Sequence, residues 1–257
     1  MEHARTLQDL RVVVTRPAAQ AELLCRLLAA RGAEVRRLPL QAIEPARAPA
    51  QAARQLAEHR EARAWIFTST NAVKFAALLD AGVWPPCIAV GAATAAALQA
   101  LGQSAVLPLS AYSSEGVLAL PELQAVTGHE YLIVSGEDGL DHLREGLEAR
   151  GAQVYKALVY RRVPLPHPPE AVTQALRKAQ AAIVTSGEAL QRLYALSASA
   201  DRAALLNLQL VVPSQRVVEQ AQELGFARAP LLPEPIADAA YVQCLEHWWA
   251  GAPRDPA

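Results

Sequence analysis

The fold is decided by the stretch Trp65–Val73, WIFTSTNAV, because the chain repeats its pattern at Ala182–Leu190, AIVTSGEAL. Each copy is an apolar run of the kind that forms a buried strand, and each run stops at a Thr-Ser pair. A small hydroxyl at that place is typical of a helix N-cap, and the residues that follow fit a helix. The two stretches therefore predict two copies of one strand-to-helix unit.

Other segments recur at nearly the same distance along the chain. Ala30–Val35, ARGAEV, returns 119 residues later as Ala149–Val154, ARGAQV. The two Thr-Ser pairs are 117 residues apart, and Gly102 and Gly225 are 123 residues apart. Three similar offsets indicate an internal duplication. A chain of 257 residues has room for two domains of the usual size, and ligands often bind in the cleft between such domains.

Strand-like and helix-like patterns alternate along both copies. The first strand, Val12–Thr15, is a β-branched run typical of a strand buried on both faces of a parallel sheet. The alternation predicts an α/β fold with two similar doubly wound parallel-sheet domains. Among the expected elements are strands at Val35–Ile43 and Leu231-Leu232 and helices at about Gln51–His59 and Glu170–Ala179. Proline-rich connectors stand at equivalent places, around Pro45–Pro49 and Pro164–Pro169. The domains could lie in sequence, at 1–125 and 126–250, or the chain could cross twice between them. The two connectors favour the crossing version, in which they lie together as a hinge.

Bulk composition excludes several classes of function. The net charge is −1, so the chain has no basic field for nucleic acid. No apolar run approaches the roughly 18 residues that cross a bilayer, and the polar start, Met1–Arg11, lacks the apolar segment of a signal peptide. Cys25, Cys87 and Cys244 are too scattered for a disulfide framework or a metal knuckle. We therefore expect a cytoplasmic monomer with no membrane contact and a disordered tail at 251–257.

Small residues stand where the predicted strands end and the helices begin. In open parallel sheets these carboxyl ends of strands face the ligand crevice. The N–H groups and the dipole of a helix start favour anions, so the set predicts a site for a ligand with several carboxylates or phosphates. Each hydroxyl could instead do no more than cap its own helix. The residues concerned are Thr68, Ser69, Gly91, Thr94, Thr185, Ser186 and Ser214.

Tyr160 is the candidate catalytic group. It lies beside two arginines in the second connector, and its phenol could donate a proton to a ligand, unless it only packs one face of a strand. Arg16 and Lys156 could add positive charge near an anion. Glu137–His142 looks like a metal cluster, but acidic residues also stabilise the first turn of a helix, and we expect no metal. Nucleotide-binding glycine motifs and the nucleophile elbow of hydrolases are missing from the sequence.

Taken in order, the motifs resemble those of the uroporphyrinogen-III synthase family, most closely its bacterial stand-alone form. The resemblance covers almost the whole chain. It implies two α/β domains joined by a two-stranded linker, with 1–38 plus 166–250 as one domain, 46–158 as the other, and linker strands at 39–45 and 159–165. The matching stretches are Val13–Pro17, Phe67–Val73, Ala89–Ala95, Ser114–Gly116 with Leu118, Ala149–Tyr160, Val184–Glu188, Val211–Ser214 and Leu224–Phe226.

The resemblance also implies a reaction. Members of the family close linear hydroxymethylbilane to uroporphyrinogen III, with inversion of the last pyrrole ring and loss of water, in haem biosynthesis. This is lyase chemistry that needs no metal or organic cofactor. Tyr160 matches the tyrosine thought to assist departure of the hydroxyl, and hydroxymethylbilane synthase, which acts in the preceding step, is a candidate partner. The implied substrate-binding residues are Arg16, Thr68, Ser69, Asn71, Gly91, Thr94, Ser114, Thr185, Ser186, Gly187 and Ser214.

One loop departs from the family pattern. Many relatives carry an arginine- and glycine-rich turn where this chain has the acidic stretch Ser135–Leu140, and Asn71-Ala72 replaces a frequent Asn-Gly. The acidic stretch leaves room for a second class of function, a non-catalytic two-domain module or degenerate synthase homologue that clamps an anionic ligand. A third reading is a glycosyltransferase-like enzyme, but the groups that bind a nucleotide sugar are not visible in the sequence.

Overall fold

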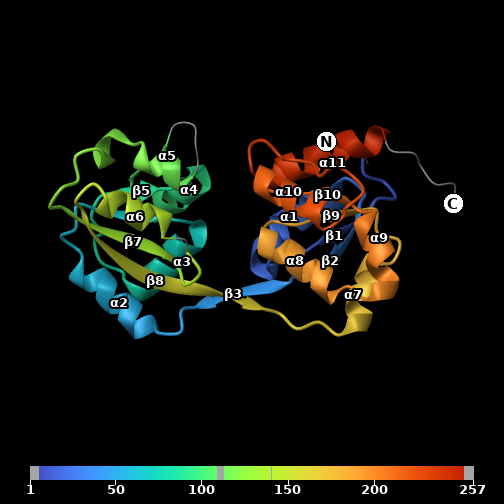
Figure 1. Ribbon diagram of the computed structural model, residues 1–257, viewed down its shortest axis with the longest axis horizontal. Helices are drawn as coiled ribbons and strands as arrows, with labels where there is room; N and C mark the ends of the chain where they lie inside the picture. Colours follow the sequence, from blue (N-terminus) through green and yellow to red (C-terminus); the bar gives the residue numbers. More distant parts are fainter. Residues whose placement is uncertain (1–5, 109–112, 140, 252–257) are drawn as a thin grey trace. The chain divides into compact units, whose positions relative to one another are not determined.

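The computed structural model describes residues 6–108, 113–139 and 141–251, and its contacts divide the chain into two compact α/β units (Figure 1). The first unit contains the chain up to Ala42 and from Pro164 onward, and the second is Ile43–Val163. The chain enters the second unit within β3 (Gln41–Pro45) and leaves it at the end of β8 (Gln153–Pro164). The predicted α/β class with two parallel-sheet units is confirmed.

The first unit is built on a four-stranded parallel sheet with the order β10-β9-β1-β2. Its sheet is buried on both faces, since Val13 belongs to the core formed with α7, α8 and α10, whereas Val12 and Val14 belong to the core formed with α1 and α11. The strands are β1 (Arg11–Val14), β2 (Glu34–Arg37), β9 (Ala181–Ile183) and β10 (Gln209–Val211). The helices are α1 (Ala18–Ala30), α7 (Pro169–Leu176), α8 (Gly187–Leu196), α9 (Arg202–Leu206), α10 (Gln215–Glu223) and α11 (Asp238–Gly251), with a 3-10 turn at Ser199–Asp201.

The second unit has a six-stranded sheet with the order β3-β8-β7-β4-β5-β6. Residues of α2 and α3 pack on one face of this sheet, against Trp65 and Phe67 of β4. Residues of α5 and α6 pack on the other face, against Ile66 of the same strand. The remaining strands are β4 (Ala64–Phe67), β5 (Cys87–Ala89), β6 (Ala105–Val106) and β7 (Glu130–Gly136). The helices are α2 (Pro49–Glu58), α3 (Thr70–Leu79), α4 (Ala92–Ala100), α5 (Ser114–Leu118) and α6 (His142–Glu148), with a 3-10 turn at Pro121–Leu123.

The strands β3 and β8 form a two-stranded connection. The Ala46 N–H donates to the Val159 carbonyl at 3.2 Å, and the Leu165 N–H donates to the Leu40 carbonyl at 2.9 Å. Because the residue number rises along one strand as it falls along the other, the two strands are antiparallel. The pairings of β4 with β5 and β7, of β5 with β6, and of β7 with β8 are all parallel.

Several predicted boundaries were wrong. The run expected at Val35–Ile43 is broken into β2 and β3 around Pro39, which has no N–H to continue a ladder. The helix expected to reach Ala179 ends at Leu176, and Lys178 beyond it has a φ of 56°, outside the helical region. Gly251, expected to open a disordered tail, is the last residue of α11, and 252–257 lie outside the described residues.

Further short elements differ from the prediction in length. The helix expected from Gln51 begins at Pro49, because proline is tolerated in the first helical turn. The last predicted strand of the second copy, Leu231-Leu232, is a single bridge between Val211 and Leu231.

Among the described residues, no helix is long and apolar enough to cross a membrane. All three cysteines carry free thiols.

Candidate functional site

The carboxyl ends of the strands β4, β5 and β7 meet at one edge of the second unit's sheet, because these strands are parallel. Ser69 follows β4 and is the N-cap of α3, where its Oγ accepts the Ala72 N–H at 3.2 Å. Gly91 follows β5 and is the N-cap of α4. Neither helix has an acidic residue in its first turn, so both starts keep the partial positive charge that attracts anions.

A β-bulge brings Tyr160 to this edge. Ser135 of β7 pairs with Leu158, but the next residue, Gly136, pairs with Tyr160, so β8 carries one extra residue, Val159. Such a bulge changes the face to which the following side chain points. Val159 and Tyr160 consequently pack into the same core, on the side covered by α2 and α3. Without the bulge, the alternation of a strand would turn Tyr160 to the opposite face.

Gly136 makes room for the tyrosine ring. A Cβ atom at Gly136 would lie 2.7 Å from Cζ and 3.1 Å from the hydroxyl oxygen of Tyr160, closer than side chains pack. On another side the ring stacks on Phe75, with 6.0 Å between the ring centroids. The Glu137 N–H donates to the Tyr160 carbonyl at 2.9 Å, which fixes the backbone of the bulge to β7. Tyr160 is therefore held by its ring and by its main chain.

The hydroxyl of Tyr160 has two polar neighbours. Ser69 Oγ lies 3.2 Å from it, and Nη2 of Arg162 donates to it at 3.4 Å. The Arg162 guanidinium carbon also lies 5.6 Å from the ring centroid, within the range of a cation–π contact. The tyrosine is only 2% exposed. The structure thus brings together Ser69 and Tyr160, two of the predicted residues, and adds Arg162, which sequence reasoning had not selected.

The other predicted residues of the second unit lie on the same strand-to-helix junctions or near them. Thr68 Oγ1 donates to the Val134 carbonyl at 3.3 Å, at the edge where Tyr160 lies. Asn71 is in the first turn of α3, and Thr94 is buried in α4. Ser114 is the first residue of α5, whose N-cap is Ser113.

In the first unit, the corresponding edge is also formed by helix starts. Ser186 caps α8 and accepts the Ala189 N–H at 3.1 Å, and Ser214 is the N-cap of α10 without a side-chain hydrogen bond. Thr185 lies between β9 and this cap, and Gly187 packs so closely that a Cβ there would meet the Gln220 side chain at 2.3 Å. A hollow of about 460 Å³ next to Gly187 is lined by polar residues, three of them carboxylates. They are Glu188, Gln191, Arg216, Glu219, Gln220 and Glu223.

Arg16, which follows β1 in the first unit, already forms an ion pair with Asp238. Its Nη1 lies 2.5 Å from Asp238 Oδ1, and both side chains are largely buried. The guanidinium also lies 5.5 Å from the ring of Tyr241, whose pKa is raised to about 12 by burial. A substrate carboxylate at this place would compete with Asp238.

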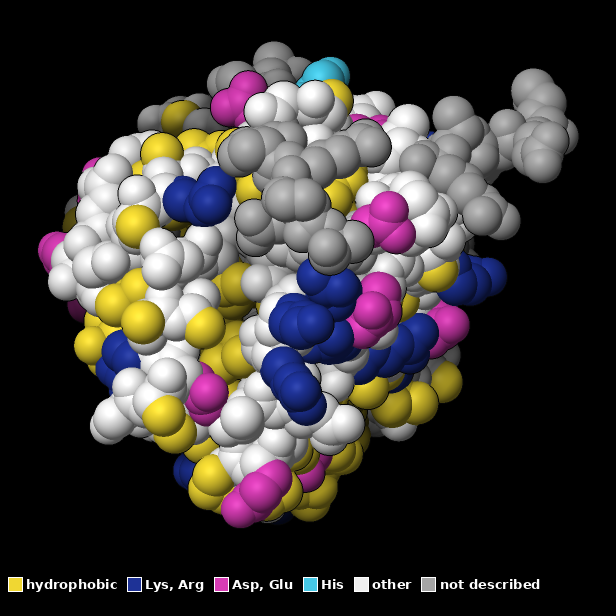
Figure 2. Space-filling model, turned by 90° about the vertical axis from the view of Figure 1, so that its right-hand side faces the viewer, with side chains coloured by type: hydrophobic (Ala, Val, Ile, Leu, Met, Phe, Trp, Pro, Cys, Tyr) yellow, Lys and Arg dark blue, Asp and Glu magenta, His cyan; other side chains and the backbone are white. Residues whose placement is uncertain are grey.

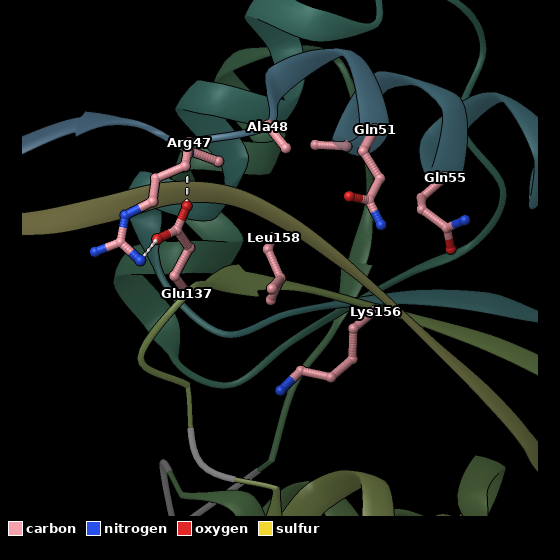
Figure 3. Close-up of a pocket in the computed structure, with 9 residues that line it drawn as sticks. Arg47, Ala48, Gln51, Gln55, Glu137, Lys156 and Leu158 are labelled. Atoms are coloured by element: carbon pink, nitrogen blue, oxygen red, sulfur yellow. Dashed lines mark hydrogen bonds and ion pairs between the residues drawn. The ribbon is translucent and has the colours of Figure 1, made fainter.

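Two acids that follow β7, Glu137 and Asp141, are paired within the second unit. The Glu137 carboxylate accepts the backbone N–H of Arg47 at 2.6 Å and lies 3.5 Å from the Arg47 guanidinium, beside a hollow of about 350 Å³ (Figure 3). Asp141 contacts Lys156 at 3.0 Å and Arg144 at 3.2 Å, and these hydrogen bonds lower its pKa. Leu140 lies outside the described residues. These acids are therefore matched by neighbouring cations, and Lys156 is engaged away from Tyr160.

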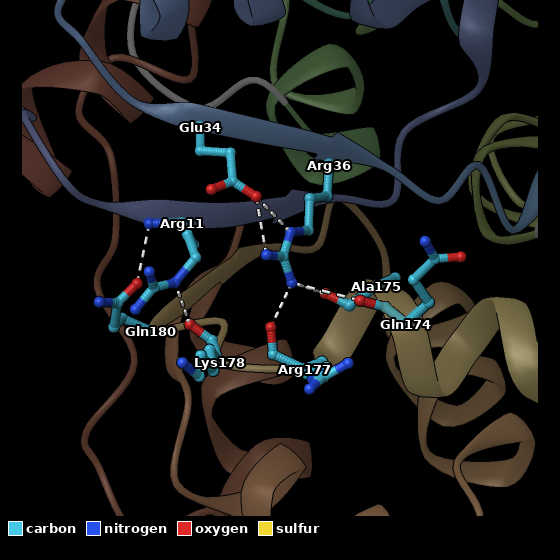
Figure 4. Close-up of polar contacts among 8 residues, drawn as sticks. All are labelled: Arg11, Glu34, Arg36, Gln174, Ala175, Arg177, Lys178 and Gln180. Atoms are coloured by element: carbon cyan, nitrogen blue, oxygen red, sulfur yellow. Dashed lines mark hydrogen bonds and ion pairs between the residues drawn. The ribbon is translucent and has the colours of Figure 1, made fainter.

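Two arginines of the first unit, Arg11 and Arg36, contact the chain at the end of α7 and just beyond it. Arg36 on β2 donates to the Gln174 and Ala175 carbonyls at 3.2 and 3.3 Å and also to the Arg177 carbonyl, which caps the end of α7 (Figure 4). Arg11 donates to the Lys178 carbonyl at 2.6 Å. Figure 2 shows one face of this unit, on which Lys and Arg side chains gather beside Asp and Glu side chains. We interpret the Arg36 contacts as structural.

Comparisons with known proteins agree with the motifs. The family model described as uroporphyrinogen-III synthase HemD matches residues 22–240. The chain is 34% identical to the uroporphyrinogen-III synthase of Escherichia coli (strain K12) over 225 residues, 84% of this chain and 92% of that protein. It is 36% identical to the enzyme of Salmonella typhimurium (strain LT2) over the same shares.

Solved structures show the same fold. The chain resembles a mutant uroporphyrinogen III synthase from Thermus thermophilus with a TM-score of 0.64 and 20% identity, over 93% of this chain and 98% of that one. It resembles the synthetase of Helicobacter pylori 26695 with a TM-score of 0.59 and 16% identity, over 94% and 99%. With its strand-to-helix motifs in order, and relatives that match over most of both chains, the protein belongs to the uroporphyrinogen-III synthase family.

Proposed function

We propose that the protein closes hydroxymethylbilane to uroporphyrinogen III with inversion of the last pyrrole ring and loss of water, as a hydro-lyase of haem biosynthesis. The family membership and the relatives' names support this activity. The structural observation that supports it most directly is the position of Tyr160. Its hydroxyl lies beside Ser69, the N-cap of α3, at the edge of the sheet where the helices start. Anionic ligands of parallel-sheet proteins bind at this edge.

Tyr160 would act as the general acid of the first step. Its proton passes to the hydroxyl of the hydroxymethyl group, the C–O bond breaks, and its electron pair leaves with the oxygen as water. An azafulvene-type cation remains on the pyrrole chain. The far ring attacks this cation through its substituted carbon to give a spiro intermediate, which fragments and recloses in the flipped sense. The proton lost when the macrocycle closes restores Tyr160, so the step needs no metal, oxidant or reductant.

The starts of α3 and α4 suit the carboxylates of the substrate, because their first turns hold no acidic side chain. The first turn of α10 holds none either, whereas Glu115 and Glu188 stand in the first turns of α5 and α8. We propose that acetate and propionate groups bind at Thr68, Ser69, Asn71, Gly91, Thr94 and Ser114 through the helix starts. Arg16, Thr185, Ser186, Gly187 and Ser214 would bind further carboxylates only where the neighbouring acids permit it.

We also propose the setting in which the protein works. Three free thiols, two of them buried, agree with the reducing cytoplasm. The protein would act there as a monomer on hydroxymethylbilane released by hydroxymethylbilane synthase. Its domains would be 1–38 plus 166–250 and 46–158, with the linker strands 39–45 and 159–165 as the hinge that closes around substrate.

The product isomer tests the proposal. Hydroxymethylbilane closes without an enzyme to uroporphyrinogen I, so the protein is mixed with freshly generated substrate and the isomers are separated after oxidation. Uroporphyrinogen III as the main product is the expected result. If isomer I alone forms, at the spontaneous rate, the protein is a binding module that does not catalyse the reaction.

A further inference from the structure

Arg162 lies next to the hydroxyl that the proposed reaction needs. Nη2 of Arg162 donates to the Tyr160 hydroxyl at 3.4 Å, and the guanidinium carbon lies 5.6 Å from the ring centroid. Among the described residues, no carboxylate pairs with Arg162. The adjacent Arg161 is different, since its Nη2 contacts Glu44 at 2.7 Å.

The hydrogen bonds to the Tyr160 hydroxyl determine which group its proton can be donated to. Arginine has donors and no acceptor, so the Tyr160 oxygen must accept from Arg162. Ser69 Oγ already accepts the Ala72 N–H, and its own proton can be donated to Tyr160 at 3.2 Å. With its oxygen accepting from both neighbours, Tyr160 keeps its hydroxyl proton for a third group.

We propose that Arg162 is the positioning residue that makes Tyr160 a proton donor. It holds the phenol oxygen as an acceptor, and it stabilises the negative charge that appears on this oxygen when the proton passes to the leaving hydroxyl. Ser69 is the neutral second donor of the same arrangement. This inference rests on the proposed function, because it assigns Arg162 a role in the departure of water.

A double-mutant cycle tests the inference. In the full chain, Arg162→Gln lowers kcat for uroporphyrinogen III about tenfold or more, which corresponds to about 1.4 kcal/mol in the transition state, and changes KM little. Arg162→Lys keeps the charge and recovers part of kcat. In a Tyr160→Phe background, Arg162→Gln has no further effect, because the hydroxyl through which it acts is gone.

Arg161→Gln is the matched control, since this neighbouring arginine pairs with Glu44 and not with Tyr160. Any effect of Arg161→Gln on kcat should be the same in the wild type and in the Tyr160→Phe background, and circular dichroism should show that every variant is folded. Wild-type kcat in Arg162→Gln, or an equal loss in the Tyr160→Phe background, would overturn the role of Arg162. If the wild type forms isomer III, either of these results refutes the role of Arg162 alone and leaves the proposed function intact. If the wild type forms no isomer III, the proposed function itself is refuted.

Discussion

Replacement of Gly136 by alanine tests whether the bulge in β8 holds Tyr160 as described. A Cβ at Gly136 would lie 2.7, 2.8 and 3.1 Å from Cζ, Cε2 and the hydroxyl oxygen of Tyr160, so the ring must move by several tenths of an ångström. Phe75 packs on the ring and opposes this movement. Overpacking of this kind costs about 1–3 kcal/mol. The change from glycine to alanine alone would favour folding by about 0.4–1 kcal/mol, so a net loss measures the clash.

The assay combines urea unfolding with turnover. We expect Gly136→Ala to lower the free energy of unfolding and to lower kcat as well, because the displaced hydroxyl loses its place beside Ser69. In a Tyr160→Ala background the same glycine substitution should cost nothing, since the atoms that clash are absent. An equal cost with and without the tyrosine ring would refute the close approach of β7 to Tyr160, and with it the geometry proposed for the site.

Three further outcomes follow from the structure. Ser69→Ala removes the cap of α3 and should lower the free energy of unfolding in urea by about 1 kcal/mol. It should also lower kcat more than Ser186→Ala, which removes the equivalent cap of α8 in the first unit. Arg16→Gln should raise KM and leave kcat nearly unchanged if Arg16 binds a substrate carboxylate in competition with Asp238; an unchanged KM would leave it a structural residue. Burial raises the pKa of the Cys87 thiol from 9.0 to about 11. The protonated thiol therefore contributes its full stabilisation below about pH 9, and this contribution is lost as the pH rises toward 11. When the free energy of unfolding is measured at each pH, a Cys87→Ala variant should lose less stability over that range.

The repeat in the sequence was enough to predict the α/β class, because each copy combines a continuous apolar strand with a helix that starts at a small hydroxyl. Ser69 and Ser186 cap α3 and α8, as this local pattern suggests. Capping depends on residues three apart in the chain, so the sequence contains the signal.

The arrangement around Tyr160 could not be read from the sequence. The bulge arises from the register between β7 and β8, which is set by packing across the sheet and not by the residues of one strand. One signal was present, since Gly136 ends an apolar strand, and a glycine at such a place often marks a close approach of other atoms. The neutralisation of Arg16 was equally hidden, because Asp238 lies 222 residues away in the chain.

The most direct test of the account is the rate at which Tyr160→Phe forms uroporphyrinogen III from hydroxymethylbilane in a single turnover. Phenylalanine keeps the ring against Phe75 and removes only the hydroxyl that would give up the proton. General acid catalysis is worth about 10²–10⁴-fold, so the rate should fall by at least about a hundredfold and isomer I should accumulate by spontaneous closure. A folded Tyr160→Phe variant that forms isomer III at the wild-type rate would contradict the assignment of Tyr160 as the acid.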